Sequence, residues 1–334
     1  MTKEKNVILT AQDIVVEFDV RDKILTAIRG VSLELIEGEV LALVGESGSG
    51  KSVLTKTFTG MLEDNGRIAN GSILYRDQDL TEFSSHKDWE QIRGAKIATI
   101  FQDPMTSLDP IKTIGSQITE VIVKHQGKTA QEAKDLAIDY MNKVGIPDAE
   151  RRFNEYPFQY SGGMRQRIVI AIALACRPDV LICDEPTTAL DVTIQAQILD
   201  LIKDLQEEHK AGIILITHDL GVVAQVADRV AVMYAGQIVE LATVQELFTH
   251  PLHPYTRSLL KSIPQTDKDN DMLHVIKGMV PSLKKLKPTG CRFADRIPWI
   301  PAAEHEASPV LHEISPGHFV RCSCWKNFRF EDEV

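Results

Sequence analysis

Short apolar runs recur along the chain and predict strands. The run Val40–Val44 is apolar throughout, as in a strand buried on both faces, whereas Val31–Leu35 alternates between apolar and polar positions. Gly38 supplies a turn between the two. Comparable runs predict further strands at residues 71–75, 95–101, 180–183 and 212–217.

Amphipathic segments separate these runs and predict helices. Segment 193–208 places its apolar residues on one side of a helix, and 129–144 also has helical spacing. Segments 53–61 and 166–176 are expected to be helical too. Strands that alternate with helices predict an α/β fold, with a mostly parallel sheet covered by helices on its faces.

The pattern weakens from Pro264, where Pro, Lys and acidic residues accumulate and periodicity fades. We therefore expect one large domain over residues 1–262 and a smaller, irregular C-terminal appendage over 263–334.

Composition adds three constraints. The 334 residues are 43% hydrophobic and 25% charged, as in soluble globular proteins. The formal net charge of -10 argues against a nucleic-acid partner, because binding to the phosphate backbone of a nucleic acid needs a basic face. No run approaches the roughly 20 apolar residues that span a bilayer, and residues 1–10 lack the apolar core of a secretory signal. We expect a cytoplasmic chain that acts at the membrane only through partner proteins.

A phosphate-binding loop follows the strand at 40–44. Residues 45–52 fit the pattern G-x-x-x-x-G-K-[ST] between a strand and a helix. Glycines let successive N–H groups point inward at an anion, and the following helix adds the positive end of its dipole. The lysine then reaches the β- and γ-phosphates, and the serine hydroxyl ligates Mg²⁺. The predicted nucleotide-binding residues are Gly45, Glu46, Ser47, Gly48, Ser49, Gly50, Lys51 and Ser52.

An acidic pair ends the apolar strand at 180–183. Asp184 is placed at the C-terminal end of that strand, where it can hold Mg²⁺ directly or through water. Glu185 is placed to polarise the attacking water. Acidic residues often end apolar strands, so the phosphate loop is what favours a catalytic role for this pair.

Four further motifs identify the class of P-loop protein. They are Phe101-Gln102-Asp103-Pro104, Tyr160-Ser161-Gly162-Gly163-Met164-Arg165-Gln166-Arg167, Thr188-Ala189-Leu190-Asp191 and Ile216-Thr217-His218-Asp219. In this order they resemble the Q-loop, the signature sequence, the D-loop and the switch histidine of the ABC ATPase family. Each is weak alone, but together they leave little room for coincidence. The resemblance covers residues from about 10 to 260 and implies the P-loop NTPase fold of an ABC ATPase.

The resemblance implies ATP and Mg²⁺ as cofactors and a head-to-tail pair of ATPase domains. In this family each ATP lies between one P-loop and the opposite signature. Ser161, Gly162 and Gly163 precede a helix that starts near Met164, so they form a second anion site, which should hold the partner's phosphates. The D-loop residue Asp191 is assigned to the same nucleotide site by resemblance.

The resemblance also implies roles for three separated residues and one subdomain. Gln102 would ligate or sense Mg²⁺ and the attacking water, and His218 would contact the γ-phosphate. Phe18, judged by its distance before the strand at Val31, would stack on adenine. Residues of about 104–175 would form the helical subdomain that grips a transmembrane partner.

Three segments resemble the oligopeptide/dipeptide permease branch of this family. They are the eleven residues from His250 to Leu260, the Q-loop sequence at 101–110, and the tail motifs at 290–294 and 316–322. Met164, where many ABC proteins have Gln, resembles the D-type of the two ATPase subunits in this branch. The resemblance makes residues 263–334 an oligopeptide-permease-type extension.

The five cysteines do not form a disulfide framework. Cys176 and Cys183 lie in apolar runs, which predicts buried thiols. Tails of the permease branch often carry four cysteines that can hold an iron–sulfur cluster, and this tail has three, Cys291, Cys322 and Cys324.

Position 297, where a further cysteine is expected, is Ile297. Three thiolates are one short of the usual four, so we expect reduced, structural thiols without a cluster. The aromatic residues expected to pack this region are Phe293, Trp299, Phe319 and Trp325.

The resemblance as a whole implies the ATP-hydrolysing subunit of an importer that takes up oligopeptides or dipeptides. Its partners would be a second homologous ATPase subunit, as a heterodimer, two transmembrane permease subunits and an external peptide-binding protein. The chain would be peripheral on the cytoplasmic face of the cell membrane. The cargo stays open among dipeptides, longer peptides, nickel complexes and other small solutes.

Two other classes of ABC protein fit this sequence less well. A soluble ABC protein acting on ribosomes or DNA usually has two cassettes or a long coiled-coil insertion, and this chain has one P-loop and no sustained heptads. An ATPase-dead regulatory subunit is disfavoured because Lys51, Asp184, Glu185 and His218 are all present.

Overall fold

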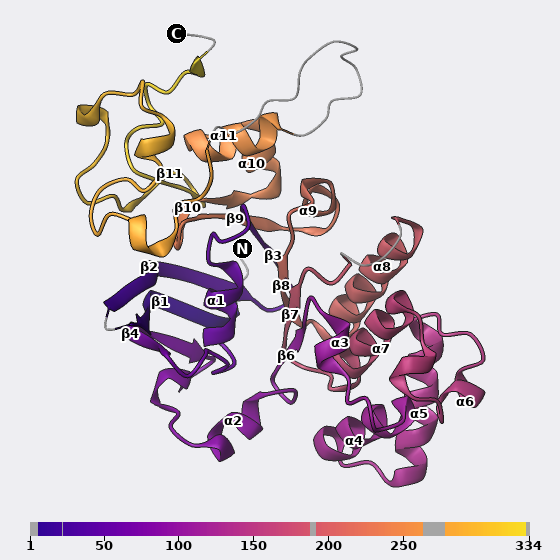
Figure 1. The fold of residues 1–334 in the computed structure, drawn as a ribbon. Helices are drawn as coiled ribbons and strands as arrows, with labels where there is room; N and C mark the ends of the chain where they lie inside the picture. Colours follow the sequence, from indigo (N-terminus) through magenta and orange to yellow (C-terminus); the bar gives the residue numbers. More distant parts are fainter. Residues whose placement is uncertain (1–5, 22, 188–191, 263–277, 332–334) are drawn as a thin grey trace. The chain divides into compact units, whose positions relative to one another are not determined.

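The computed structural model describes residues 6–21, 23–187, 192–262 and 278–331 (Figure 1). The chain forms two compact units, each assembled from discontinuous segments. The first comprises Met1–Leu9, Leu35–Glu39 and Glu82–Leu215. The second comprises Thr10–Glu34, Val40–Thr81 and Ile216–Val334.

The first unit contains parallel strands with apolar sequences. Its strands are β6 (Ile97–Ile100), β7 (Val180–Asp184) and β8 (Gly212–Ile216), in the order β8-β7-β6. β6 and β7 are parallel, with Ile97 opposite Val180 and Ile100 opposite Cys183. Strands covered on both faces contain few polar residues, which explains the uninterrupted apolar runs in the sequence.

Helices make up most of the first unit between residues 104 and 175. They are α3 (Pro104–Ser107), α4 (Ile114–Gln126), α5 (Ala130–Lys143), α6 (Ala149–Arg152) and α7 (Gly162–Ala175). Helices α4, α5 and α7 pack on one another (Figure 1). Thr129 and Glu132 form a capping box that fixes the start of α5. The unit also has α2 (His86–Ile92), the 3₁₀ turn η2 (Pro157–Gln159) and α8 (Val192–His209).

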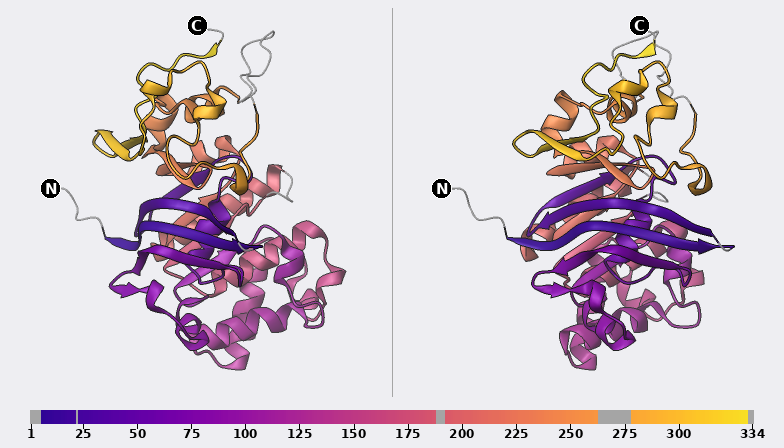
Figure 2. Two further views of the ribbon diagram at one scale, coloured as in Figure 1. Left: turned by 60° about the vertical axis from the view of Figure 1, so that its left-hand side comes forward. Right: turned by 90° about the vertical axis from the view of Figure 1, so that its left-hand side faces the viewer.

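The second unit contains a sheet of long strands near its N-terminal end. The order is β2-β1-β4-β5, with β1 at Val7–Val20, β2 at Lys23–Ile36, β4 at Gly66–Tyr75 and β5 at Gln78–Asp79. Figure 2 shows β1 and β2 as the two long indigo strands side by side. The sequence predicted only parts of β2 and β4, because alternation fades where both faces are partly exposed. The 3₁₀ turn η1 (Leu80–Glu82) follows β5.

A second group of strands in this unit includes β3 (Val40–Val44), β9 (Arg229–Tyr234) and β10 (Gln237–Thr243). β3 and β9 are parallel, and β9 and β10 are antiparallel. The helices are α1 (Lys51–Thr57), α9 (Leu220–Val226), α10 (Val244–Thr249) and α11 (Pro254–Lys261). Of these, α9 packs on β3, while α10 and α11 pack on β10.

The C-terminal extension is less irregular than the sequence predicted. It contains the 3₁₀ turns η3 (Leu283–Lys285), η4 (Ala294–Arg296) and η5 (Ala302–Glu304), then a hairpin of β11 (Leu311–Ser315) and β12 (His318–Arg321). β12 pairs antiparallel with β10, so the extension continues a sheet that begins before residue 262. The parallel α/β core is confirmed, with antiparallel strands added at this edge.

A search of the described helices found none that is both long enough and apolar enough to cross a bilayer.

Candidate functional site

The phosphate loop lies between β3 and α1, as predicted. Gly45 and Gly50 have φ of 152° and 103°, in the region that L side chains rarely adopt. A Cβ on Gly45 would lie 2.1 Å from the carbonyl oxygen of Met233, and one on Gly50 would lie 2.9 Å from Ile28 Cδ1. Close approach of β9 to Gly45 and of β2 to Gly50 therefore requires glycine at both positions.

Lys51 lies inside the loop that it closes. Its side chain is buried, and Nζ donates to the carbonyl oxygens of Gly45, at 2.8 Å, and Glu46, at 3.1 Å. Ser52, the next residue, is exposed. Helix α1 has no side-chain cap at Gly50, so its first N–H groups are left for an anion. This arrangement fits the triphosphate of a nucleotide, with Ser52 free to turn toward a cation.

Two residues from distant parts of the sequence hold Glu46, the second residue of the loop. The backbone N–H of Glu46 donates to the hydroxyl of Tyr255 at 2.7 Å, and its carboxylate accepts from Arg296 Nη1 at 2.5 Å. Tyr255 is fully buried, and burial raises the pKa of its hydroxyl. Arg296 also lies 5.7 Å from the ring centres of Tyr234 and Phe293. Sequence reasoning missed this support, since no local pattern links a P-loop to a residue 250 positions away.

The acidic pair and the Q-loop glutamine meet in the first unit. Asp184 is the last residue of β7, and Glu185 follows it with φ of 47°. Gln102 Nε2 donates to Glu185 Oε2 at 2.8 Å. Gln102 is exposed, while both acidic residues are half-buried. Gln102 therefore lies beside the general-base candidate.

The signature sequence forms the N-terminal end of α7. The helix begins at Gly162, two residues before the predicted start, because Ser161 is the N-cap and its hydroxyl accepts the Met164 N–H at 3.3 Å. Ser161 and Gly162 are exposed. Gln166 Nε2 donates to the carbonyl of Pro186 at 2.9 Å, which ties this helix to the segment after Glu185.

The remaining predicted residues lie in separate places. His218 is exposed just after β8, and the following Asp219 caps α9. Phe18 is half-buried on β1, where its ring occupies the space beside Gly66, so a Cβ there would meet Phe18 Cε1 at 2.7 Å. Asp191 lies outside the described residues.

The segment from His250 to Leu260 has a structural explanation. Glu240 on β10 has no solvent exposure and accepts the backbone N–H groups of Leu252 and His253, both at 2.8 Å. His318 Nε2 lies 2.8 Å from the same carboxylate. These bonds satisfy the buried Glu240 and place Tyr255, two residues later, against the phosphate loop.

The predicted buried thiols are found, and of the four aromatic residues expected to pack the extension Phe293 is buried while Trp299, Phe319 and Trp325 are half-buried. Cys176 and Cys183 are buried, and burial raises the pKa of Cys176 to about 12. Phe293 is 2% exposed and lies against Tyr234 and Tyr255.

Comparisons with known proteins agree with this site. The sequence pattern of the family described as ABC transporter matches residues 28–188, and that of the oligopeptide/dipeptide transporter C-terminal region matches 239–299. The chain is 76% identical to the oligopeptide transport ATP-binding protein AmiE of Streptococcus pneumoniae, over 96% of this chain and 90% of that protein. It is 49% identical to the oligopeptide transport ATP-binding protein OppD of Lactococcus lactis, over 99% and 98% of the two chains.

Solved structures show the same fold. The dimeric post-hydrolysis state of the ATP-binding cassette MJ0796, bound to ADP and Pi, is 26% identical, with a TM-score of 0.64 over 71% of this chain and 98% of that one. The protein cbiO1 from Clostridium perfringens, part of an ABC transporter complex, is 28% identical, with a TM-score of 0.62 over 74% and 92%. The loop geometry, the ordered motifs and these likenesses together place the chain in the ABC transporter family, among the ATP-binding subunits of its oligopeptide and dipeptide branch.

Proposed function

We propose that this chain binds Mg²⁺–ATP and that its hydrolysis of ATP powers the uptake of oligopeptides or dipeptides across the cell membrane. The observation that carries the proposal is the phosphate loop, in which Lys51 is held by the carbonyls of Gly45 and Glu46 beside an uncapped helix start. Lys51 places its positive charge beside the N-terminal end of α1, so a triphosphate is a favourable ligand.

Residues of the phosphate loop and of other segments would bind different parts of the nucleotide. The N–H groups at the uncapped start of α1, from Gly50 to Ser52, would donate to phosphate oxygens, and Lys51 would neutralise the β- and γ-phosphates. Mg²⁺ would be held by oxygen ligands of Ser52, Gln102 and Asp184, which are the ligand type it prefers. Phe18 would stack on the adenine ring.

Hydrolysis requires a group that orients water at the γ-phosphate. Glu185 is the candidate because its carboxylate is half-buried and its Oε2 accepts the Gln102 amide at 2.8 Å. A carboxylate in this position can accept a proton from water. His218 would contact the γ-phosphate and so report its presence.

A second ATPase subunit completes each nucleotide site in this proposal. Ser161 and Gly162 are exposed at the start of α7, so a phosphate can reach the N-terminal end of the helix dipole. The partner's nucleotide would bind there, with Gly163 and Asp191 in the same contact. The pair would be a heterodimer, since this chain resembles one of two subunit types.

Peptide cargo follows from the relatives, which are named for oligopeptide and dipeptide transport. We propose two transmembrane permease subunits and an external peptide-binding protein as the other partners. The chain would then lie on the cytoplasmic face of the membrane as a peripheral subunit.

The test is recovery of the assembled complex. Tagged Glu185→Gln protein is captured from detergent-solubilised membranes with ATP and Mg²⁺, and Lys51→Met protein is captured in parallel as the control. The first should retain two multi-span proteins and a homologous ATPase, and the control should retain less of the ATPase. Recovery of ribosomal or DNA-bound proteins without membrane partners would contradict the transport assignment.

A further inference from the structure

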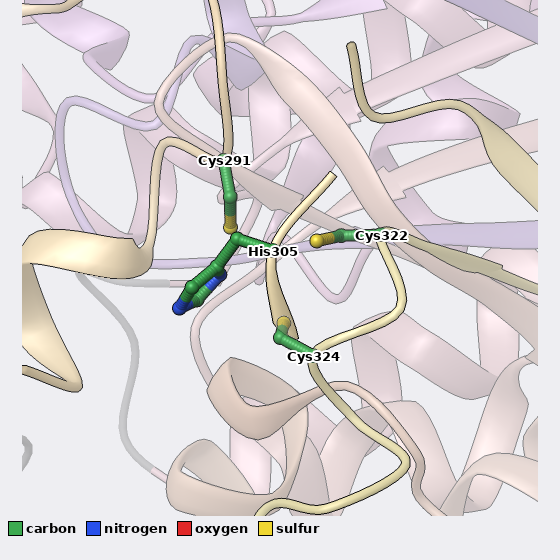
Figure 3. Close-up of side chains that lie close together, drawn as sticks. All are labelled: Cys291, His305, Cys322 and Cys324. Atoms are coloured by element: carbon green, nitrogen blue, oxygen red, sulfur yellow. The ribbon is translucent and has the colours of Figure 1, made fainter. Parts of the chain in front are cut away.

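Four potential metal ligands converge in the C-terminal extension. They are Cys291, His305, Cys322 and Cys324, and their ligand atoms all lie within 4.8 Å of one another. Figure 3 shows the three sulfur atoms pointing toward one another, with the ring of His305 beside Cys291. The four residues come from three loops, so the fold, and not the local sequence, brings them together.

His305 is the unexpected member of this cluster. Both ring nitrogens have almost no solvent exposure, and neither has a hydrogen-bond partner in the described part of the chain. A buried imidazole without a partner loses the hydrogen bonds that water would supply, which costs free energy. Coordination of one ring nitrogen to a metal ion removes the share of that cost that belongs to that nitrogen.

The backbone around the sulfurs is shaped for thiolates. Cys322 follows β12 with φ of 69°, a conformation that is rare for residues other than glycine. Its sulfur accepts the backbone N–H of Glu306 at 3.4 Å. Backbone donors of this kind orient and stabilise sulfur ligands.

Buried positive charge surrounds the cluster. Arg292 and Arg321 line one small cavity with Cys291 and Cys322. Within the described residues, the hydrogen bonds of Arg321 go to carbonyl oxygens, including that of Ile238 at 2.7 Å, and not to carboxylates. Three thiolates and one divalent cation carry a net charge of −1, which would compensate these guanidiniums.

An iron–sulfur cluster fits this arrangement poorly. Such clusters commonly use four cysteines on separate irons, which holds the sulfurs farther apart than one ion does. A single Zn²⁺ takes four N or S ligands, at about 2.3 Å for sulfur and about 2.0 Å for nitrogen, so neighbouring ligand atoms lie roughly 3.5 Å apart. Ligand atoms already within 4.8 Å need move by only about 1 Å to reach that geometry.

We propose that Cys291, His305, Cys322 and Cys324 bind one Zn²⁺ ion as a closed, tetrahedral structural site. Each cysteine loses its S–H proton to solvent when the metal binds, and the imidazole binds as the neutral ring. No position is left for water or substrate, so the ion is structural and not catalytic. It joins the loops around η4 and η5 to the end of β12, in a region with little regular structure.

The first experiment measures metal and sulfide in the full-length protein. The chain is purified anaerobically with a reductant, and zinc, iron and acid-labile sulfide are quantified per chain. We expect about one zinc and no sulfide. Iron with an equal amount of sulfide would overturn the proposal in favour of a cluster. A disulfide bond in place of the metal site would also overturn the proposal. Such a protein would have a mass lower by two hydrogens and would bind no added Zn²⁺.

Variants assign the ligands. Stripped protein is titrated with Zn²⁺ alone, and Co²⁺ is used as a spectroscopic probe of tetrahedral thiolate coordination. Cys322→Ser and His305→Ala should weaken Zn²⁺ binding roughly 100-fold or more. The controls Cys176→Ser and His86→Ala remove the same residue types elsewhere and should bind like wild type.

A conservative replacement separates ligation from folding. His305→Cys supplies a fourth sulfur, so Zn²⁺ binding should persist while the thiolate-to-cobalt charge-transfer band grows. An unchanged cobalt spectrum in His305→Cys would remove His305 from the site. None of these measurements depends on ATP, so they stand apart from the test of transport.

Discussion

The carboxylate of Glu46 in the phosphate loop lies 2.5 Å from the guanidinium of Arg296 in the C-terminal extension. The Arg296 side chain is 5% exposed and that of Glu46 is 29% exposed, so the pair is largely shielded from water. Burial lowers the pKa of Arg296, but its interactions with the Glu46 carboxylate and with Tyr234 together outweigh burial, so the pKa is raised. A residue of the extension thus fixes a residue of the loop that Lys51 closes.

Removing the arginine should therefore affect both stability and nucleotide binding. Arg296→Met keeps the apolar stem but leaves the Glu46 carboxylate half-buried without its partner. We expect a loss of about 2–3 kcal/mol in the free energy of unfolding, together with several-fold weaker ATP binding. Urea unfolding and an ATP titration measure the two effects.

A neighbouring ion pair provides the control. Lys287 and Asp295 are 2.7 Å apart, but their side chains are 67% and 63% exposed. Lys287→Met should cost less than about 1 kcal/mol, because exposed pairs contribute little. Equal losses in Arg296→Met and Lys287→Met would mean that the link to the loop carries no special stability.

Lys51→Met should weaken ATP binding at least about 10-fold, because the variant cannot neutralise the β- and γ-phosphates. The ammonium of Lys51 is held by loop carbonyls at 2.8 and 3.1 Å, so it is already in place before ATP arrives. Lys56→Met changes a lysine of the same helix whose partner is Glu63, and it should bind ATP normally. Calorimetric titration of both variants with ATP and Mg²⁺ gives the comparison.

Glu185→Gln should slow hydrolysis by about 10²–10⁴-fold while leaving ATP affinity near that of wild type. The amide cannot take a proton from water, although it can still bond to Gln102. Turnover in the assembled complex and ATP binding to the chain test the two halves separately. Glu207→Gln, on the exposed side of α8, is the matched control and should leave turnover unchanged. A Glu185→Gln complex that turns over at the wild-type rate would remove Glu185 from the role of general base.

Elements with strong local patterns could be predicted from the sequence. The runs that form β3, β7 and β8 are apolar throughout, and the predicted bounds agree within a residue or two. Helix α7 was predicted to start late because its first residues, Gly162 and Gly163, have poor helix propensity, and the Ser161 cap compensates for this. The pairing of β12 with β10 depends on a contact between distant segments, which no local pattern contains.

The candidate site likewise contains residues that a local motif reveals and residues that only contacts between distant segments reveal. The phosphate loop, the Asp184–Glu185 pair and the signature are contiguous motifs, and so the sequence alone could assign them. Arg296 could not be found in this way, because its partner Glu46 precedes it by 250 residues. His305 could not be found in this way either, because a single histidine 17 residues before Cys322 has no recognisable ligand spacing.

The pair of Glu240 and His318 predicts a pH dependence of stability. His318 is buried, with Nε2 at 2.8 Å from Glu240 and Nδ1 at 3.6 Å from Glu246. Its hydrogen bond to Glu240 is the main reason that its pKa is raised above 6.5. The folded protein therefore holds the proton more tightly than the unfolded chain does. The resulting stabilisation is complete below pH 6.5 and is lost as the pH rises through the folded pKa.

His318→Gln keeps a hydrogen-bonding side chain and removes the titratable charge. Its melting temperature should fall furthest below that of wild type below pH 6.5, and the gap should narrow as the pH rises through the raised pKa of His318 in the folded protein. Other titrating groups are shared by the two proteins and cancel in this difference. His86→Gln, at an exposed histidine, should follow wild type throughout. A gap that stays constant or widens with rising pH would show that the charged form of His318 does not stabilise the fold.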